Sequence, residues 1–278
     1  MTGPGQGDGA PRGVLFVDLD GTLVGAGGVA ERVWPALAAL RAAGFRVAIC
    51  TGRPGRGLAL AYAQRVDVDG LHVFESGAVV MDGHGRVHAF DALPGPAVAR
   101  VVALGAGHGA TVEAYTADGR YLAAERDALI AGHEELLGFA ADIAPLPPAE
   151  PVVRVQWVLP QPGWPALRAA ADAVDALAGI APHEGTSPKM PGIAFVSLTA
   201  AGVSKGLGVR RVLDAYGLTR EQAAMAGDNK NDLAGFAAVG RVFVAADGAP
   251  EALAVATDVI PGPAAGGVAD AAMALLAG

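Results

Sequence analysis

Short apolar runs alternate along the chain with stretches of helical periodicity. Each run is bounded by Gly, Asp or Thr and has the length of one buried strand; the runs are VLFVDL (14–19), RVAIC (46–50), LHVF (71–74), AAMAG (223–227) and RVFVA (241–245). Helix-like segments occupy 31–43, 203–216, 231–238 and 264–276. Strands that alternate with helices form parallel sheets with helices on both faces. The sequence therefore predicts an α/β fold with a doubly wound, Rossmann-like parallel sheet.

The middle of the chain has a different pattern. Asp-Gly between alternating apolar residues favours a tight hairpin turn, which predicts hairpins around Asp82-Gly83 and Asp118-Gly119. Further strands are predicted in VVRVQWVL and GIAFVSLT, and helices near 95–106, 127–140 and 165–178. We therefore expect a flexible tail over residues 1–12, a catalytic core formed by 13–83 and 199–278, and an inserted α+β cap over 84–198.

Composition excludes several classes of protein. A net charge of −8 argues against a nucleic-acid partner. No run reaches the roughly 18 apolar residues that a membrane span needs, and the first residues lack the pattern of a signal peptide, so no membrane partner and a cytoplasmic location are expected. One cysteine cannot form an internal disulfide and argues against a structural zinc site. The oligomeric state is not readable from the sequence.

Polar side chains follow three of the predicted strands, at the points where the strands end. The residues are Asp18 and Asp20 after the first run, Thr51 and Gly52 after the second, and Asp228, Asn231 and Asp232 after AAMAG. In an open parallel sheet the ligand site lies beyond the carboxyl ends of the strands. Carboxylates that meet there repel one another unless a cation joins them, and Mg²⁺ prefers oxygen ligands of this kind. The sequence therefore predicts a magnesium site.

A positive charge is predicted beside these carboxylates. The chain has only three lysines, Lys189, Lys205 and Lys230. Lys205 stands in GVSKG, where a helix is predicted to begin, and both a helix N-terminus and an ammonium group can bind phosphate. We therefore expect an anionic, phosphate-bearing substrate.

These motifs resemble those of the haloacid dehalogenase-like (HAD) phosphatases, in the Cof-type branch (subfamily IIB), which carries an α/β cap between its second and third motifs. DLDGTL (18–23) resembles the first motif, Thr51 of ICTGR the second, Lys205 of VSKG the third and GDNKND (227–232) the fourth. The interval between Thr51 and Lys205 exceeds the need of one or two βα units of about 30 residues, and the excess suits such a cap.

The resemblance implies a magnesium-dependent phosphatase that acts on a small phosphate monoester, such as a sugar phosphate or a phosphorylated sugar derivative. Asp18 would attack the phosphorus and form an aspartyl-phosphate, and Asp20 would protonate the leaving alcohol. Mg²⁺ would be held by the Asp18 carboxylate, the Asp20 carbonyl and Asp228. The implied phosphate and substrate contacts are Gly21, Thr51, Gly52, Arg53, Lys205 and Asn231. Asp232 would position Lys205 or hydrogen-bond to the metal ligands.

Other interpretations stay open on the residues alone. Cys50 and Arg56 have the C-x5-R spacing of a cysteine-dependent phosphatase, although an apolar-flanked single cysteine is more often a buried hydrophobe. A receiver-type phosphoryl-binding module uses similar strand-end residues but needs a shorter chain. A phosphomutase or phosphotransferase could use the same aspartates.

Several polar residues have no role in these motifs. The cap residues that could reach a ligand, or could equally face solvent, are Glu113, Arg154, Gln156, His183, Glu184 and Lys189. His84 and His88 are expected on a solvated hairpin rather than at a metal. The family's E-N-G-A segment appears here as ESGA, with Ser76 in place of Asn, which leaves the contact made from this position open.

Overall fold

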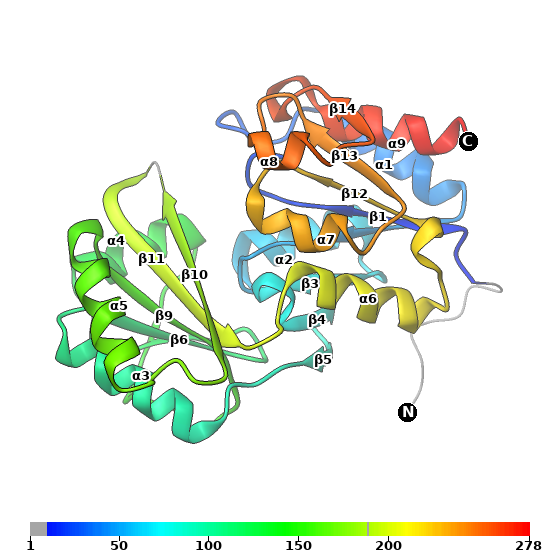
Figure 1. Cartoon of the computed structure of the whole chain (residues 1–278). Helices are drawn as coiled ribbons and strands as arrows, with labels where there is room; N and C mark the ends of the chain where they lie inside the picture. The colour runs from blue at the N-terminus through cyan, green and yellow to red at the C-terminus, as the bar shows by residue number, and fades with distance from the viewer. Residues whose placement is uncertain (1–9, 188) are drawn as a thin grey trace. The chain divides into compact units, whose positions relative to one another are not determined.

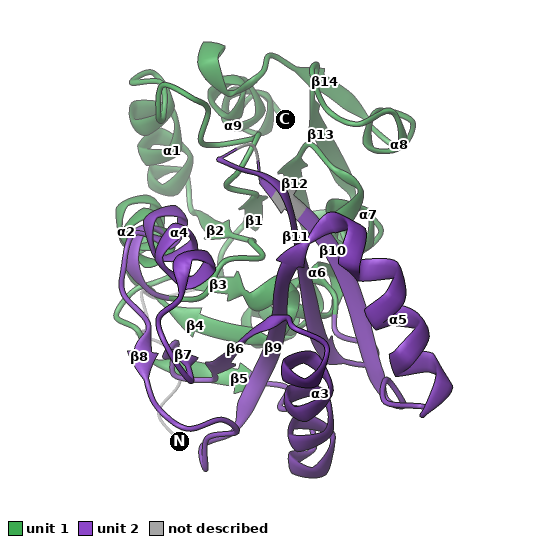
Figure 2. Ribbon diagram, turned by 90° about the vertical axis from the view of Figure 1, so that its left-hand side faces the viewer, with its two compact units in different colours: residues 1–55, 59–89, 204–278 green, residues 56–58, 90–203 purple. Residues whose placement is uncertain are grey.

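The computed structural model describes residues 10–187 and 189–278, which form two compact units (Figure 2). Residues 10–55, together with 59–89 and 204–278, form the first, which we call the core unit. Residues 56–58, 90–187 and 189–203 form the second, the cap unit. These limits lie a few residues beyond the 83/84 and 198/199 junctions expected from the sequence. One reason is that the second strand of the hairpin around Asp82-Gly83 pairs within a sheet of the core unit.

Five strands form the main sheet of the core unit, in the order β14-β13-β12-β1-β2. They are β1 (Gly13–Val17), β2 (Phe45–Ile49), β12 (Ala223–Gly227), β13 (Arg241–Ala245) and β14 (Asp258–Ile260). All four ladders are parallel, which confirms the predicted sheet. The edge strand β14 was not predicted, because its three residues form too short an apolar run.

The run LHVF forms β3 (Leu71–Phe74), as predicted, but its main partner differs from the expected parallel neighbour. β3 pairs antiparallel with β4 (Val79–Asp82), and β5 (Val87–Phe90) completes a three-stranded sheet. A single parallel bridge, Cys50 to Val73, joins it to the end of β2. The Nδ1 atom of His72 accepts from the amide of Ile49, so a side-chain hydrogen bond takes the place of one backbone hydrogen bond between β2 and β3.

Helices cover the main sheet on both faces (Figure 1). On one face lie α1 (Val33–Ala42) and α9 (Gly267–Leu276), and on the other α6 (Lys205–Tyr216) and α7 (Leu233–Phe236). The remaining core helices are α2 (Gly57–Asp67), which begins in the 56–58 segment, α8 (Pro250–Leu253) and the 3₁₀ turns Glu75–Gly77, Arg220–Gln222, Lys230–Asp232 and Pro263–Ala265. In the described part of the chain, no helix is both long enough and apolar enough to span a bilayer.

The cap unit contains a six-stranded sheet in the order β10-β11-β9-β6-β7-β8. The strands are β6 (Thr111–Thr116), β7 (Tyr121–Ala123), β8 (Asp142–Ile143), β9 (Val152–Pro160), β10 (Ile180–Ser187) and β11 (Met190–Ala200). All neighbours are antiparallel except β7 and β8. The predicted hairpin at Asp118-Gly119 is formed by β6 and β7, whereas the polar strand β10 was not predicted.

Alternation of side chains gives the cap sheet two different faces. One face packs apolar residues against α3 (Gly95–Gly107) and α5 (Trp164–Ala173), with Val101, Trp157 and Leu167 among the buried residues. The other face carries Glu113, Gln156 and Ser197, and α4 (Ala128–Leu137) supplies His133 to it. The cap sheet therefore has an apolar core on one face and a polar row on the other.

Candidate active site

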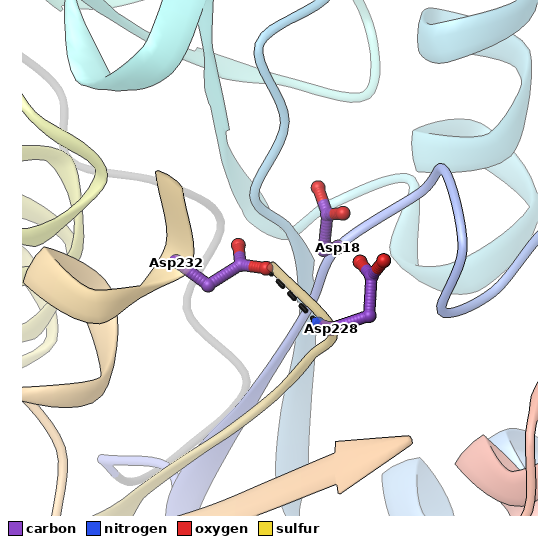
Figure 3. Close-up of side chains that lie close together, drawn as sticks. All are labelled: Asp18, Asp228 and Asp232. Carbon is purple, nitrogen blue, oxygen red and sulfur yellow. Dashed lines mark hydrogen bonds between the residues drawn. The ribbon is translucent and has the colours of Figure 1, made fainter. Parts of the chain in front are cut away.

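Three carboxylates converge at the carboxyl ends of β1 and β12 (Figure 3). Asp18 directly follows β1 and Asp228 directly follows β12, and the amide of Asp18 donates to the carbonyl of Ala226 on the neighbouring strand at 3.0 Å. Asp232 lies four residues further along the same loop. One oxygen of each of the three carboxylates lies within 4.8 Å of the others. Adjacent parallel strands thus bring together residues that are about 200 positions apart in the chain.

Lys205 is the cation of this cluster. It is the first residue of α6, its side chain is 1% exposed, and its Nζ lies 2.7 Å from Asp18 Oδ1 and 2.6 Å from Asp232 Oδ1. The Ser204 hydroxyl caps the helix by accepting from the amide of Leu207 at 3.3 Å. The helix start therefore fixes the position of the ammonium group between two buried carboxylates.

Asp232 orders the loop that carries Asp228. Its Oδ1 accepts from Lys205, and its Oδ2 accepts from the amides of Asp228 and Asn229, each at 3.0 Å. Both carboxylate oxygens of Asp232 thus already accept from nitrogen donors. Asp232 therefore contributes negative charge to the site and is less suited than Asp18 or Asp228 to bind a metal ion. Asn231 is exposed in the short 3₁₀ turn that starts at Lys230.

The turn after Asp18 fits closely around Asp228. Gly21 has a φ of +84°, and a Cβ there would lie 2.3 Å from Asp228 Oδ2, so this position requires glycine. The Thr22 hydroxyl donates to Asp228 Oδ1 at 3.1 Å. The sequence placed Thr22 in the DLDGT motif without a role, and the structure assigns it to orienting the Asp228 carboxylate.

The loop Thr51–Arg53 follows β2 and is held by a strained turn. The amide of Thr51 donates to the Val73 carbonyl, and the Thr51 and Arg53 carbonyls accept from the amides of Ser76 and Glu75. Glu75 and Ser76 both have positive φ values, 51° and 56°, although neither is glycine. Such backbone strain persists only where neighbouring structure imposes it, and here the neighbour is the loop expected to bind phosphate. The sequence flagged Ser76 but did not indicate this supporting turn.

Asp20 and Arg53 form a two-point ion pair. Arg53 Nε lies 2.8 Å from Asp20 Oδ2, and Nη2 lies 2.6 Å from Oδ1. The Asp20 side chain is 57% exposed and that of Arg53 is 27% exposed. The sequence assigned these residues to proton transfer and to substrate contact, and it did not indicate that they pair with each other.

Burial dominates the electrostatics of the cluster. It raises the pKa of Asp18 to about 8, against the opposing effect of Lys205 and with a further rise from Asp232. Burial and Asp232 likewise raise the pKa of Asp228 to about 6. For Lys205, burial acts to lower the pKa, but the negative charges of Asp18 and Asp232 outweigh it and raise the pKa above its ordinary value. The site holds more negative charge than one lysine neutralises.

The cluster has the chemistry of a hard-cation site. Asp18, which is buried, and Asp228, which is partly buried, offer closely spaced oxygens, and their pKa values are raised mainly by burial and further by the negative charge of Asp232. A divalent cation with oxygen ligands would supply positive charge and lower both pKa values. The residues present therefore fit Mg²⁺.

Cys50 directly follows β2 and belongs to the hydrophobic core of the core unit. It is fully buried, and burial raises the pKa of its thiol above the ordinary value. A nucleophilic cysteine needs the opposite, an accessible thiol with a lowered pKa. The C-x5-R spacing is therefore not a cysteine-phosphatase loop in this fold.

The six polar cap residues divide into a buried and an exposed group. Solvation, one of the two alternatives drawn from the sequence, is therefore wrong for the buried ones, and contact with a ligand stays a prediction. Glu113, Arg154 and Gln156 are buried, whereas His183, Glu184 and Lys189 are exposed. The Glu113 carboxylate accepts from Tyr115, Tyr121, His133 and Gln156 at 2.7 to 3.0 Å. A buried carboxylate with four donors belongs to the internal support of the cap.

The hairpin histidines pair with aspartates in the core unit. His84 Nε2 lies 3.0 Å from Asp69 Oδ1, and His88 Nε2 lies 2.8 Å from Asp82 Oδ2. Among the described residues, the Asp18, Asp228 and Asp232 cluster is the one group with metal-site spacing, and neither histidine belongs to it.

Solved structures share this architecture over nearly the whole chain. A haloacid dehalogenase-like hydrolase from Bacteroides thetaiotaomicron has a TM-score of 0.82 at 19% identity, covering 95% of this chain and 99% of its own. A subclass IIB sugar phosphatase of the HAD superfamily has a TM-score of 0.76 at 19% identity, covering 95% and 98%. A protein from Thermotoga maritima has a TM-score of 0.79 at 16% identity, covering 94% and 97%.

Sequence comparison leads to the same family. No curated protein matches the chain. The sequence model of the haloacid dehalogenase-like hydrolases matches residues 15–139 and 183–271, which include the Asp18, Thr51, Lys205 and Asp228 segments and most of the cap. The chain therefore belongs to the haloacid dehalogenase-like hydrolase family.

Proposed function

We propose that this protein, a phosphatase of its family, hydrolyses a small phosphate monoester, with Asp18 as the nucleophile and Mg²⁺ as the cofactor. The observation that carries the proposal is the buried contact of Lys205 with both Asp18 and Asp232, beside Asp228. A lysine held against a carboxylate at the edge of the sheet places a nucleophile and a phosphate-binding cation side by side.

In the first half of the reaction, an Asp18 carboxylate oxygen attacks phosphorus as the bond from phosphorus to the ester oxygen breaks. The electron pair of that bond goes to the ester oxygen, which takes a proton from the Asp20 carboxyl and departs as an alcohol. Lys205 and the Thr51 hydroxyl donate to the non-bridging oxygens. The product of this half is an aspartyl-phosphate on Asp18.

In the second half, water attacks the phosphorus and gives a proton back to Asp20. The bond between phosphorus and the Asp18 oxygen breaks, so inorganic phosphate leaves and the carboxylate is restored. Asp18, the Asp20 carbonyl and Asp228 would hold Mg²⁺. When bound, the ion offsets repulsion between the Asp18 carboxylate and the phosphate dianion.

A sugar phosphate, or a phosphorylated sugar derivative, is the substrate class that we propose. The support is the similarity in fold to a subclass IIB sugar phosphatase of the HAD superfamily.

The test measures phosphate release from a panel of sugar phosphates and other small monoesters, with Mg²⁺ and with a chelator. The variants are Asp18→Asn, Cys50→Ser and, as a matched control, Asp214→Asn, an exposed aspartate on the helix that carries Lys205. We expect release that requires Mg²⁺ and Asp18 but survives the other two changes. Acid-quenched protein should carry a hydroxylamine-labile phosphoryl group in the wild type and not in Asp18→Asn.

Three outcomes would contradict the proposal. Substantial release by folded Asp18→Asn would exclude the nucleophile. Activity that depends on Cys50 and ignores the chelator would restore the cysteine mechanism. Transfer of the phosphoryl group to another position of the sugar without free phosphate would identify a phosphomutase.

A further inference from the structure

The pair between Asp20 and Arg53 conflicts with the role of Asp20 in the proposed reaction. Both carboxylate oxygens accept from the guanidinium, at 2.8 and 2.6 Å. Two parallel N–H donors hold a carboxylate in one orientation. While this pair exists, each carboxylate oxygen has a lone pair committed to Arg53. At least one of the two contacts therefore has to open before Asp20 can turn that oxygen toward a leaving group.

Arg53 is well placed to sense phosphate. Its amide donates to the Thr51 hydroxyl at 3.2 Å, and its carbonyl accepts from the amide of Glu75 at 3.0 Å. The backbone of Arg53 is thus tied to the phosphate loop and to the strained turn behind it. Its side chain reaches out from this loop to an Asp20 whose side chain is 57% exposed, so the contact between them is accessible to a ligand.

Charge favours exchange of the partner. A guanidinium fork matches the oxygens of a phosphate as well as those of a carboxylate, and a phosphate ester dianion carries twice the charge of Asp20. An ion pair that solvent can reach contributes little to stability, so the loss of one of its two contacts is readily offset by the new contact.

We propose that Arg53 is a positioning residue for Asp20. Without substrate it holds the Asp20 carboxylate away from the reacting bond. When a phosphate ester binds, one N–H of the Arg53 fork moves to a phosphoryl oxygen, while the other stays on one Asp20 oxygen and directs the second Asp20 oxygen toward the ester oxygen. This inference rests on the proposed function, and it adds that phosphate binding itself brings the general acid into place.

A residue that only binds phosphate would behave differently from one that positions Asp20. Loss of a plain phosphate contact raises KM, and the inhibition constant of inorganic phosphate, by the same factor for every ester. Loss of the positioning role lowers kcat, and it does so most for esters whose leaving alcohol needs a proton. p-Nitrophenolate departs without protonation, so its ester reports the reaction without a general acid.

The experiment compares p-nitrophenyl phosphate with the best sugar phosphate of the panel. Arg53→Gln, Arg53→Lys, Asp20→Asn and the double variant Arg53→Gln/Asp20→Asn are assayed for kcat, KM and inhibition by inorganic phosphate. The matched control is Arg32→Gln, because Arg32 forms a similar two-point pair with Asp270 at 2.7 and 3.1 Å elsewhere in the core unit.

We expect Arg53→Gln to lower kcat on the sugar phosphate by about tenfold or more, a part of the usual contribution of a general acid, and to change kcat on p-nitrophenyl phosphate by less than about threefold. In the Asp20→Asn background, Arg53→Gln should have little further effect on kcat, because the positioned group is gone. Arg53→Lys should recover phosphate affinity but only part of kcat, since an ammonium lacks the fork. Arg32→Gln should match the wild type.

An equal loss of kcat with both esters, or independent and multiplicative effects of Arg53→Gln and Asp20→Asn, would overturn this inference and leave the proposed function in place. Failure of the wild type to release phosphate from any monoester with Mg²⁺ present would instead overturn the proposed function, and the inference with it.

Discussion

His72 lies on β3 and hydrogen-bonds to β2, the strand that precedes the loop Thr51–Arg53. Because its ring is buried, we expect the stability of the core unit to depend on pH. The ring is fully buried, its Nδ1 accepts from the amide of Ile49 at 3.0 Å, and its Nε2 donates to the carbonyl of Asp67 at 2.9 Å. The bond that Nδ1 accepts requires the neutral ring, because a protonated Nδ1 is a donor. Burial lowers the pKa of His72 from 6.5 to about 4, even though Asp67 acts to raise it.

The sign and size of the effect follow from the two pKa values. The unfolded chain takes up a proton near pH 6.5, whereas the folded protein does so only near pH 4. The stability that His72 contributes is therefore complete above pH 6.5 and is lost as the pH falls toward 4. Between pH 7.5 and 4.5 the loss amounts to about 2 to 3 kcal/mol of unfolding free energy.

The assay is urea unfolding of the wild type and of His72→Gln at pH 7.5 and 4.5. Gln retains one donor and one acceptor but does not titrate. The raised pKa values of Asp18 and Asp228 act in the opposite direction, because the folded state binds those protons more tightly, so the difference between the two proteins is the quantity to compare. At pH 7.5 this difference reports packing alone. We expect it to shift in favour of the variant by about 2 to 3 kcal/mol at pH 4.5; a difference that is the same at both pH values would refute a neutral, buried His72.

Three further outcomes are expected. Gly77→Ala should lower the free energy of unfolding of the core unit, measured in urea, by about 3 kcal/mol or more, because the added Cβ would lie 1.9 Å from the Ser204 carbonyl oxygen at a φ of +106°. The control is Gly85→Ala, where φ is +85° but the space is open, and it should cost only about 1 to 2 kcal/mol. Glu113→Leu should lower the unfolding free energy of the cap unit by about 3 kcal/mol, because its four donors lose their acceptor; unchanged stability would contradict the network. Mg²⁺ should raise the Tm of the wild type, and chelator should reverse the rise, while Asp228→Asn should respond much less; equal shifts would place the ion elsewhere.

Several features of the fold could be predicted because local pattern and tertiary role agree. LHVF, AAMAG and RVFVA form strands over the residues that the apolar runs indicated, and Gly70, Asp228 and Gly240 each mark one end of a run. β10 was missed because it contains Pro182, His183, Glu184 and Gly185, which do not form an apolar run. Its pairing with β11 over the whole strand supplies the hydrogen bonds that compensate for its weak local preference.

By itself, the sequence determined that strand-end carboxylates and one lysine would meet, because parallel strands place their carboxyl ends on a single edge and DLDGT, VSKG and GDNKND stand at those ends or at the start of a helix. Only the tertiary structure decided which groups pair. The Asp20 and Arg53 pair joins loops after different strands, and Glu113, which looks like a solvent-facing residue in TVEAYT, is buried by Tyr121, His133 and Gln156. Such contacts depend on distances between segments far apart in the chain, and local periodicity carries no information about those distances.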